Sequence, residues 1–163
     1  ADGIHSIVRQ YVLASQQQQA VQPRFSGTWA YRGIIKTQAF KQAIQQLGND
    51  AEIADVPQMF LGKNKHILTF PIRQGEDINI VAFKSNRADV YLPEHTEWTR
   101  PVSQQQMLDD FADWSDSCQA LLALIEQPTI WALHDIEELS TYQSQSGRVI
   151  LMGDAAHAKM PHS

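Results

Sequence analysis

The clearest pattern of apolar and polar positions lies in residues 37–48. Four apolar residues lie there at positions i, i+3, i+4 and i+7, which fall on one face of a helix. They are Phe40, Ala43, Ile44 and Leu47. Thr37 is placed to cap the start of this helix and Gly48 to end it. The pattern therefore predicts an amphipathic helix whose apolar face packs into a core and forms no ligand site.

Residues 103–127 predict further helix in two pieces. Ser103 followed by Gln106 matches a capping box, in which side chains satisfy the free N–H groups of a helix start. The apolar stripe of the first piece consists of Met107, Leu108, Phe111 and Trp114. A leucine-rich second piece ends before Pro128, which cannot continue a helix. Cys118 lies within this region, and we expect it to be buried as a small apolar residue.

Other segments predict strands. Residues 25–36 are rich in aromatic and β-branched types, and residues 129–134 are similar. Residues 65–72 and 78–83 flank a short polar turn, which predicts a hairpin. Pro71 should place its strand at a sheet edge or at an irregularity, because proline donates no ladder hydrogen bond. The middle of the chain is therefore expected to form an antiparallel sheet with packed helices.

The two ends of the chain carry a different pattern. Residues 149–152 are four apolar residues between glycines, as in a parallel strand buried on both faces. Gly153 permits close approach of a ligand, and Asp154 stands where a helix would begin. An acid there either caps backbone N–H groups or accepts from ligand hydroxyls, and both alternatives stay open. At the other end, an Asp-Gly turn at Asp2 precedes a short helix expected in residues 1–14.

These patterns predict an α/β fold with an α+β middle, in which a mostly antiparallel domain is combined with pieces of a nucleotide-binding fold. The 163-residue chain is 43% hydrophobic, which indicates a folded domain with a core. It begins without Met and stops as an element starts, so we expect an internal part of a longer protein.

Composition excludes several classes of partner. The net charge is −5 without a Lys/Arg cluster, which argues against nucleic acid and anionic membranes. No apolar run has the length needed to cross a bilayer. Cys118 is the only cysteine, so an internal disulfide and a cysteine-based metal site are excluded. A single thiol fits a reducing compartment, and we expect a cytoplasmic location.

Known catalytic signatures are absent from the sequence. It contains no G-x-x-x-x-G-K loop, no G-x-G-x-x-G and no G-x-S-x-G elbow. His157 and His162 lack the H-E-x-x-H context of a zinc site, and no metal is expected. Arg32, on a predicted strand, could hold a carboxylate or phosphate by two hydrogen bonds, or pair with a structural acid. Residue chemistry alone thus indicates a candidate ligand site at Gly153 and Asp154.

Two motifs at opposite ends of the chain resemble a known family. Residues 147–157, with Pro161 following, resemble the second FAD-binding motif of the single-component flavin-dependent aromatic hydroxylases, the group A flavoprotein monooxygenases. Residues 1–9 resemble the Asp-Gly motif of the same family. The segments between them are most similar to the salicylate hydroxylase branch. Those segments are Tyr31-Arg32-Gly33, Phe70-Pro71-Ile72 with Asn79-Ile80-Val81, and Trp131-Ala132-Leu133.

The resemblance implies a reaction and a division into domains. It implies FAD as cofactor, NADH or NADPH and O2 as co-substrates, and hydroxylation of a small, salicylate-like aromatic substrate. Residues 1–22 and 129–163 would belong to a Rossmann-like FAD-binding domain that is truncated here, and residues 23–128 to the substrate-binding domain. A homodimer is left open. So are an inactive or truncated flavin-fold binding module and an oxidase or epoxidase on the same scaffold.

The resemblance also implies roles at the flavin. Asp154 would accept hydrogen bonds from the ribityl chain, with Gly153 and Ala155 beside it, and Pro161 would lie against the isoalloxazine ring. Asp2 and Arg9 would lie near the pyrophosphate, in a motif tied to the use of both FAD and NAD(P)H.

Three further residues are candidates on the substrate side. By motif position His162 lies near the flavin edge and is the one candidate for a catalytic role. Arg32 and Tyr31 are candidates for binding the substrate carboxylate or phenol. Lys159 departs from the pattern, because the branch usually has an apolar residue there.

Overall fold

The computed structural model describes residues 2–86, 88 and 90–161. The chain divides into two compact units, with β1 and β6 each running from one unit into the other. Unit 1 comprises Ala1–Gly27, Val90–Leu92 and Leu133–Ser163, and unit 2 comprises Thr28–Asp89 and Pro93–Ala132. The assignment of residues 1–22, 23–128 and 129–163 to flavin and substrate domains stays a prediction.

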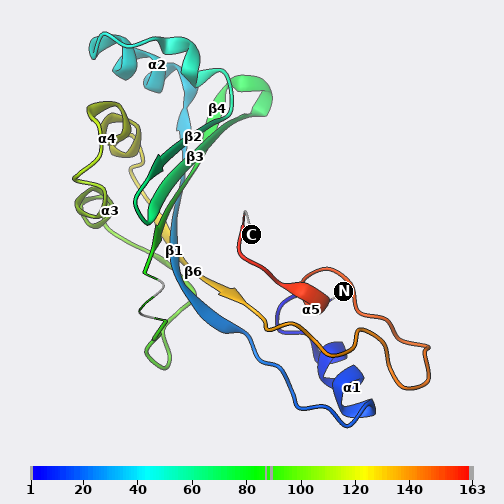
Figure 1. Cartoon of the computed structure of the whole chain (residues 1–163). Coiled ribbons are helices and arrows are strands. Elements are labelled where there is room, and N and C mark those ends of the chain that lie inside the picture. Colours follow the sequence, from blue (N-terminus) through cyan, green and yellow to red (C-terminus); the bar gives the residue numbers. More distant parts are fainter. Residues whose placement is uncertain (1, 87, 89, 162–163) are drawn as a thin grey trace. The chain divides into compact units, whose positions relative to one another are not determined.

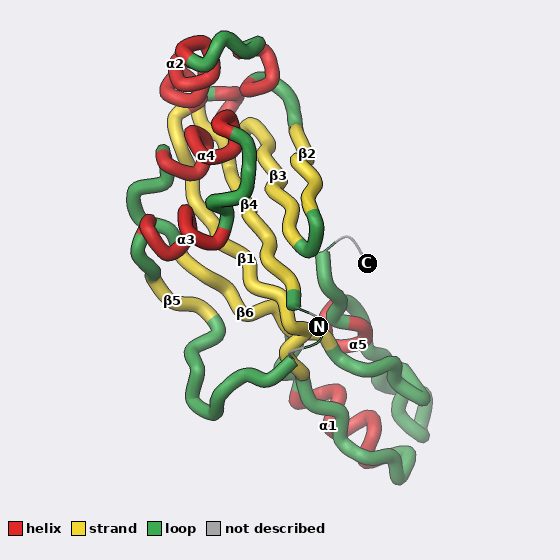
Figure 2. Tube along the Cα trace, turned by 60° about the vertical axis from the view of Figure 1, so that its left-hand side comes forward, coloured by secondary structure: helices red, strands yellow, loops and turns green. Residues whose placement is uncertain are grey.

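Six strands form one sheet (Figures 1 and 2). They are β1 (Arg24–Lys36), β2 (Gln58–Gly62), β3 (Lys65–Ile72), β4 (Asp77–Ser85), β5 (Thr99–Pro101) and β6 (Thr129–Asp135). The strand order is β2-β3-β4-β1-β6-β5, and the β2–β3, β3–β4, β4–β1 and β5–β6 pairs are antiparallel. The predicted α/β fold with an antiparallel middle sheet is confirmed, and the four strands predicted between residues 25 and 134 form. The short strands β2 and β5 were not predicted, because three to five residues carry too little alternation.

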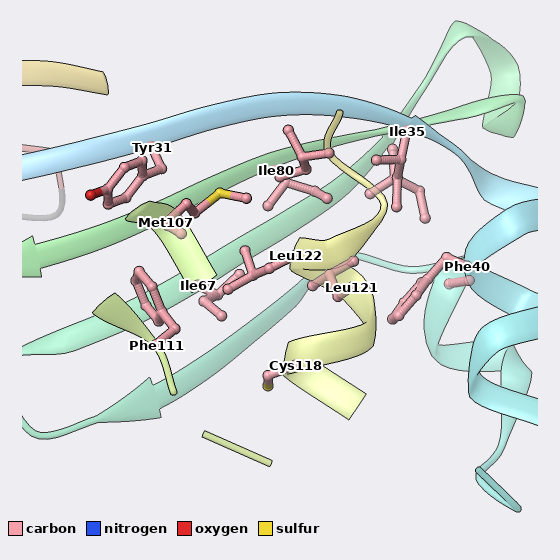
Figure 3. Packing of buried hydrophobic residues seen from close by; sticks show 14 of the residues in the cluster. Tyr31, Ile35, Phe40, Ile67, Ile80, Met107, Phe111, Cys118, Leu121 and Leu122 are labelled. Atoms are coloured by element: carbon pink, nitrogen blue, oxygen red, sulfur yellow. The ribbon is translucent and has the colours of Figure 1, made fainter. Parts of the chain in front are cut away.

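Three helices of unit 2 cover one face of the sheet (Figure 2). They are α2 (Thr37–Gln46), α3 (Gln104–Asp110) and α4 (Asp116–Ala123). Figure 3 shows Met107, Phe111, Leu121 and Leu122 beside Ile67 of the sheet, and all five side chains are fully buried. The apolar faces of the predicted helices therefore build one core against the sheet, except for Leu47, which is exposed at the end of α2. Cys118 is buried in the same cluster as expected, and burial raises the pKa of its thiol.

The start of α2 differs from the expectation. Lys36 occupies the N-cap position without a side-chain cap, and Thr37 is the first helical residue. The chain passes directly from β1 into α2, so the backbone N–H of Thr37 donates to the carbonyl of Glu76 at 3.1 Å. The other predicted signals are confirmed: Ser103 accepts from the N–H of Gln106 at 3.2 Å, and α2 stops before Gly48 at φ +73°.

Pro71 lies on an inner strand, but at a point where, among the described residues, that strand has no neighbour on one side, as the expected irregularity requires. Its strand β3 lies between β2 and β4. β2 pairs only with residues 65–69 of β3, so Pro71 lies past the last β2 partner. The missing N–H of proline therefore removes no hydrogen bond to β2.

Unit 1 contains two helices, α1 (Ile7–Ser15) and α5 (Asp154–His157), around a small core. The buried residues of this core are Val12, Leu13, Ile136, Leu139, Leu151, Ala155, Ala156 and Ala158. The short helix predicted after the Asp-Gly turn is confirmed as α1. None of the helices in the described part of the chain is long and apolar enough to cross a membrane.

The predicted buried strand at residues 149–152 is wrong for the described structure. Ile150 forms a single antiparallel bridge to Gln143, and the N–H of Leu151 donates to the carbonyl of Tyr142 at 2.8 Å. Leu151 is buried, whereas Ile150 and Met152 are 69% and 66% exposed. A strand buried on both faces needs neighbouring strands and covering layers, and within the described residues only the segment at Gln143 pairs with it.

Candidate functional site

One buried side chain joins the two end motifs of the chain. Arg9, on α1, is only 1% exposed. Its Nη2 donates to the carbonyl of Ile4 at 2.6 Å, its Nη1 to the carbonyl of Ala155 at 3.3 Å, and its Nε to the carbonyl of Val21 at 3.3 Å. The planar guanidinium presents several donors at once, so it can hold three backbone segments together. Burial lowers the pKa of Arg9, and the charge of Asp2 acts in the opposite direction.

Asp2 serves the start of α1. Its Oδ1 accepts from the Ser6 hydroxyl at 2.5 Å, and its Oδ2 accepts from the N–H groups of Ile7 and Val8 at 2.9 and 3.2 Å. These hydrogen bonds, the one from Ser6 first, lower the pKa of the Asp2 carboxyl. Ser6 is itself the N-cap residue and accepts from the N–H of Arg9 at 2.8 Å. Asp2 thus satisfies backbone N–H groups at the start of α1, while a contact of Asp2 or Arg9 with a cofactor stays a prediction.

The Gly-Asp pair lies at the start of α5. Gly153 is the N-cap residue, with φ 60° and ψ −145°, a backbone conformation that residues with a Cβ rarely adopt. Its carbonyl accepts from the N–H groups of Ala156 and His157 at 2.9 and 3.0 Å. Asp154 is therefore the first helical residue and not the cap.

The side chain of Asp154 is exposed and makes no hydrogen bond or ion pair with any other described residue. The capping alternative considered for this acid is thereby excluded. Ala155, next along the helix, is buried, and its carbonyl is held by Arg9. The oxygens of the Asp154 carboxylate are therefore free to accept hydrogen bonds, and the backbone is fixed at the next residue, Ala155.

A cavity of about 350 Å³ lies beside α5 within unit 1. It is lined by Ile136, Glu137, Glu138, Tyr142, Ala156, His157, Ala158 and Lys159. Lys159 is exposed at this cavity, so the departure from the family pattern adds a positive charge there. In the acidic segment nearby, Arg24 pairs with Asp135 at 2.8 Å and with Glu137 at 2.7 Å. In the described part of the chain no group of three metal-binding side chains occurs.

The two substrate candidates lie on opposite faces of β1, as neighbours in a strand must. Tyr31 is fully buried under the helices, where its hydroxyl donates to Oδ2 of Asp110 at 2.6 Å. Burial is the main cause that raises the pKa of Tyr31 well above its usual range, and Asp110 adds to it. Lys84 also donates to Asp110, at 2.5 Å. Tyr31 thus belongs to the core contacts of α3, and its hydroxyl is already held by Asp110.

Arg32 points away from this core. Its side chain is exposed, and its guanidinium carbon lies 4.4 Å from the ring centre of Trp131 on β6. No carboxylate of the described residues forms an ion pair with it, which excludes a structural acid within that part of the chain. The sequence did not reveal the partnership with Trp131, since strand neighbours cannot be read from one strand alone.

The predicted flavin contacts of Pro161 and His162, at the end of the chain, stay untested by the structure. Pro161 is exposed and follows α5, and its contact with a flavin ring stays a prediction. His162 lies outside the described residues, so its catalytic candidacy also stays a prediction.

Comparisons with known proteins agree with the resemblance found in the motifs. No protein-family model matches the chain. A salicylate hydroxylase of Pseudomonas putida is 50% identical over 99% of this chain and 37% of its own length. The solved structure of a salicylate hydroxylase substrate complex superposes with a TM-score of 0.93 at 45% identity, over 99% of this chain and 39% of that one.

A more distant solved structure is Klebsiella pneumoniae HpxO complexed with FAD and uric acid. It has a TM-score of 0.68 and 25% identity, over 99% of this chain and 36% of that one. The chain thus spans about 37% of the length of the curated salicylate hydroxylase that it matches. The predicted resemblance to the salicylate hydroxylase branch of the flavin-dependent aromatic hydroxylases is confirmed.

Proposed function

We propose that the protein of which this chain is a part is an FAD-dependent monooxygenase that hydroxylates a salicylate-like aromatic acid with NADH or NADPH and O2. The observation that carries the proposal is the joining of the two end motifs by Arg9 in unit 1, which leaves the Asp154 carboxylate exposed and free to accept. The similarity to salicylate hydroxylases over nearly the whole chain supports it.

The residues of unit 1 fit a flavin. Gly153 has no side chain at a point where the backbone turns sharply, so a ligand can approach it closely. Asp154 supplies carboxylate oxygens for the hydroxyl groups of the ribityl chain. Among the described residues, the guanidinium of Arg9 donates to three backbone carbonyls, and its role is to hold the Asp-Gly turn and α5 in place. When bound, FAD supplies the redox chemistry that takes electrons from NAD(P)H and transfers an oxygen atom from O2.

Arg32 of unit 2 is the proposed anchor of the substrate carboxylate. It is an exposed guanidinium on a rigid strand, and it is not consumed by an ion pair with any described acid. A guanidinium matches a carboxylate with two parallel hydrogen bonds and so fixes both the position and the rotation of an aromatic acid. The role of Arg32 in the reaction is therefore binding and orientation, not proton transfer.

The flavin assignment is tested by FAD affinity. Asp154→Ala should weaken FAD binding to the apoprotein of the full-length protein about 10- to 100-fold, since a hydrogen bond to a charged group contributes ~1.5–3 kcal/mol. Asp116→Ala is the matched control, because Asp116 is also an exposed acid at the first residue of a helix, but in unit 2. Fluorescence titration of FAD measures both. Equal affinity of the Asp154 variant and the parent would refute the assignment.

The substrate assignment is tested by turnover and selectivity. Arg32→Met should raise the KM for salicylate about tenfold or more, because a charged hydrogen bond contributes ~1.5–3 kcal/mol. The KM for the uncharged salicylamide should stay unchanged. NADH oxidation with analysis of the hydroxylated product provides the measurement. Absence of any hydroxylated product from the FAD-loaded parent with a panel of aromatic acids would overturn the proposed reaction.

We also propose a cytoplasmic location. It is supported by Cys118, the only cysteine, which is a buried free thiol of the kind that reducing compartments preserve. A homodimer that binds neither nucleic acid nor membrane is the proposed assembly, and sedimentation of the flavin-loaded protein measures its state.

A further inference from the structure

Three side chains form a connected group on the uncovered face of the unit 2 sheet. Arg32 extends from β1, and Thr129 and Trp131 extend from the neighbouring strand β6. The guanidinium lies 4.4 Å from the indole centre, and the indole Nε1 donates to Oγ1 of Thr129 at 3.1 Å. Each of these contacts lies within unit 2.

Strand alternation places the group on one face. Tyr31 and Ile35 of β1 belong to the helix-covered core, so Arg32 between them points to the opposite face. On β6, Ile130 belongs to the same core, so Thr129 and Trp131 share the face of Arg32. No helix among the described residues of unit 2 covers this face (Figure 2).

Stacking on Trp131 restricts the motion of the Arg32 guanidinium but leaves its N–H groups free to donate hydrogen bonds. A cation above an aromatic face is attracted by the ring quadrupole, and a planar guanidinium can stack while its N–H groups point outward in its own plane. The hydrogen bond to Thr129 fixes the orientation of the indole and so of the stacking surface. An unrestrained arginine would lose more rotamer entropy when it bound a ligand.

We propose that Trp131 is a positioning residue, oriented by Thr129, that holds the Arg32 guanidinium ready for the carboxylate of an aromatic acid. The inference rests on the proposed role of Arg32 as the substrate anchor. Trp131 does not replace that anchor: it makes carboxylate binding tighter than binding of the uncharged analogue. The substrate class is therefore narrowed to aromatic compounds with a free carboxylate.

The test compares salicylate with salicylamide as ligands of the FAD-loaded full-length protein, with dissociation constants taken from the perturbation of the flavin spectrum. Trp131→Leu should raise the Kd for salicylate about three- to tenfold and leave that for salicylamide unchanged, as expected from the range of cation–π energies. Trp131→Phe keeps an aromatic face and should restore part of the salicylate affinity. Thr129→Val should raise the Kd for salicylate by a factor of about two.

Trp29→Leu is the matched control. Trp29 also lies beside an arginine, because the guanidinium carbon of Arg100 is 5.9 Å from its ring centre. This pair, however, lies on the helix-covered side of the sheet. Its replacement should not change the ratio of the two dissociation constants.

The outcomes separate the two proposals. If Arg32→Met leaves the Kd for salicylate unchanged, the anchor itself is wrong and the role of Trp131 fails with it. If Arg32→Met raises that Kd but Trp131→Leu does not, only the positioning role is overturned. An equal loss of salicylate and salicylamide binding in Trp131→Leu would show a purely structural role and would also overturn it. Retention of FAD by each variant monitors the flavin assignment independently.

Discussion

Different kinds of internal contact stabilise the two units of this chain. Unit 2 has a large apolar core between a sheet and three helices, with sixteen buried members from Tyr31 to Ile130. Unit 1 has a core of eight residues, three of them alanines. Polar contacts between separate segments also hold it together, among them the hydrogen bonds from Arg9 to three carbonyls.

This difference between the two cores affects how closely stability is linked to ligand binding in each unit. The core of unit 2 is mostly apolar, and it supports the strand β1 on which Arg32 is exposed. In unit 1 the structural contact from Arg9 ends on Ala155, which is next in sequence to Asp154, the residue proposed to bind FAD. Stability and cofactor binding should therefore be coupled in unit 1 and separable in unit 2.

The largest expected effect is on the core of unit 2. Phe111 is fully buried and packs edge-on against Tyr31 at 6.3 Å and Trp114 at 5.4 Å between ring centres. Phe111→Ala should lower the free energy of unfolding by about 3–5 kcal/mol, because it removes buried area and leaves a cavity. Urea denaturation measures this, with Phe111→Leu as the control that keeps most of the volume. FAD affinity of the folded fraction should be unchanged, and a large loss of it would contradict the separation of the units.

The next effect concerns the polar tie in unit 1. Arg9→Met should lower the free energy of unfolding by about 3 kcal/mol, since buried carbonyls lose their donors. It should also weaken FAD binding, because α5 loses the contact at Ala155. Arg148→Met, at an exposed arginine of the same unit, serves as the control for loss of charge. Full FAD affinity in a destabilised Arg9 variant would break the proposed coupling.

A smaller effect is expected from backbone strain. Gly153→Ala forces a Cβ into a conformation that favours glycine and should cost about 2 kcal/mol. Gly147→Ala is the matched control, since Gly147 also has a positive φ of 69° in unit 1 and has no atom within 4 Å of an added Cβ. Both variants should unfold at lower urea concentration, but only Gly153→Ala should lose FAD affinity. If the Gly153→Ala and Gly147→Ala variants bound FAD with equal affinity, the flavin would not lie against Gly153.

The smallest effect is pH-dependent and tests the capping of α1. The pKa of Asp2 is lowered from 3.8 by the Ser6 hydroxyl and by backbone N–H groups, so its ionised form stabilises the folded state. This contribution is present above the unfolded pKa of 3.8 and is lost as the pH falls through the lower folded pKa. Asp2→Asn should therefore lower Tm at pH 7, and the difference from the parent should shrink below about pH 4. A difference that persists unchanged at pH 3 would contradict an electrostatic origin.

Much of unit 2 could be predicted from the sequence, because its elements are long and periodic. The helix at residues 37–48 and the strands at 25–36 and 65–72 each repeat their pattern several times. The errors lie where the pattern is short or where tertiary neighbours decide. Pro71 lies in an inner strand, at a point that β2 does not reach, and among the described residues the segment 149–152 forms a bridge to Gln143 alone.

The candidate site was predicted in part. The motifs named Asp154 and Arg9, but the sequence could not separate a capping acid from a free one. The structure separates them, because Gly153 occupies the cap position and Asp2 caps the other helix. Likewise, the sequence placed Tyr31 and Arg32 together, whereas alternation along β1 sends one side chain into the core and the other to the opposite face.

The sequence by itself determined most of the long helices and strands, the two end motifs and the resemblance to flavin-dependent aromatic hydroxylases. Periodicity and turn chemistry are local properties of the chain, so they can be read without coordinates. Only the tertiary structure decided that Arg9 binds Ala155, 146 residues away, and that Arg32 stacks on Trp131. Such partners are selected by the packing of distant segments, and no single stretch of sequence contains that information.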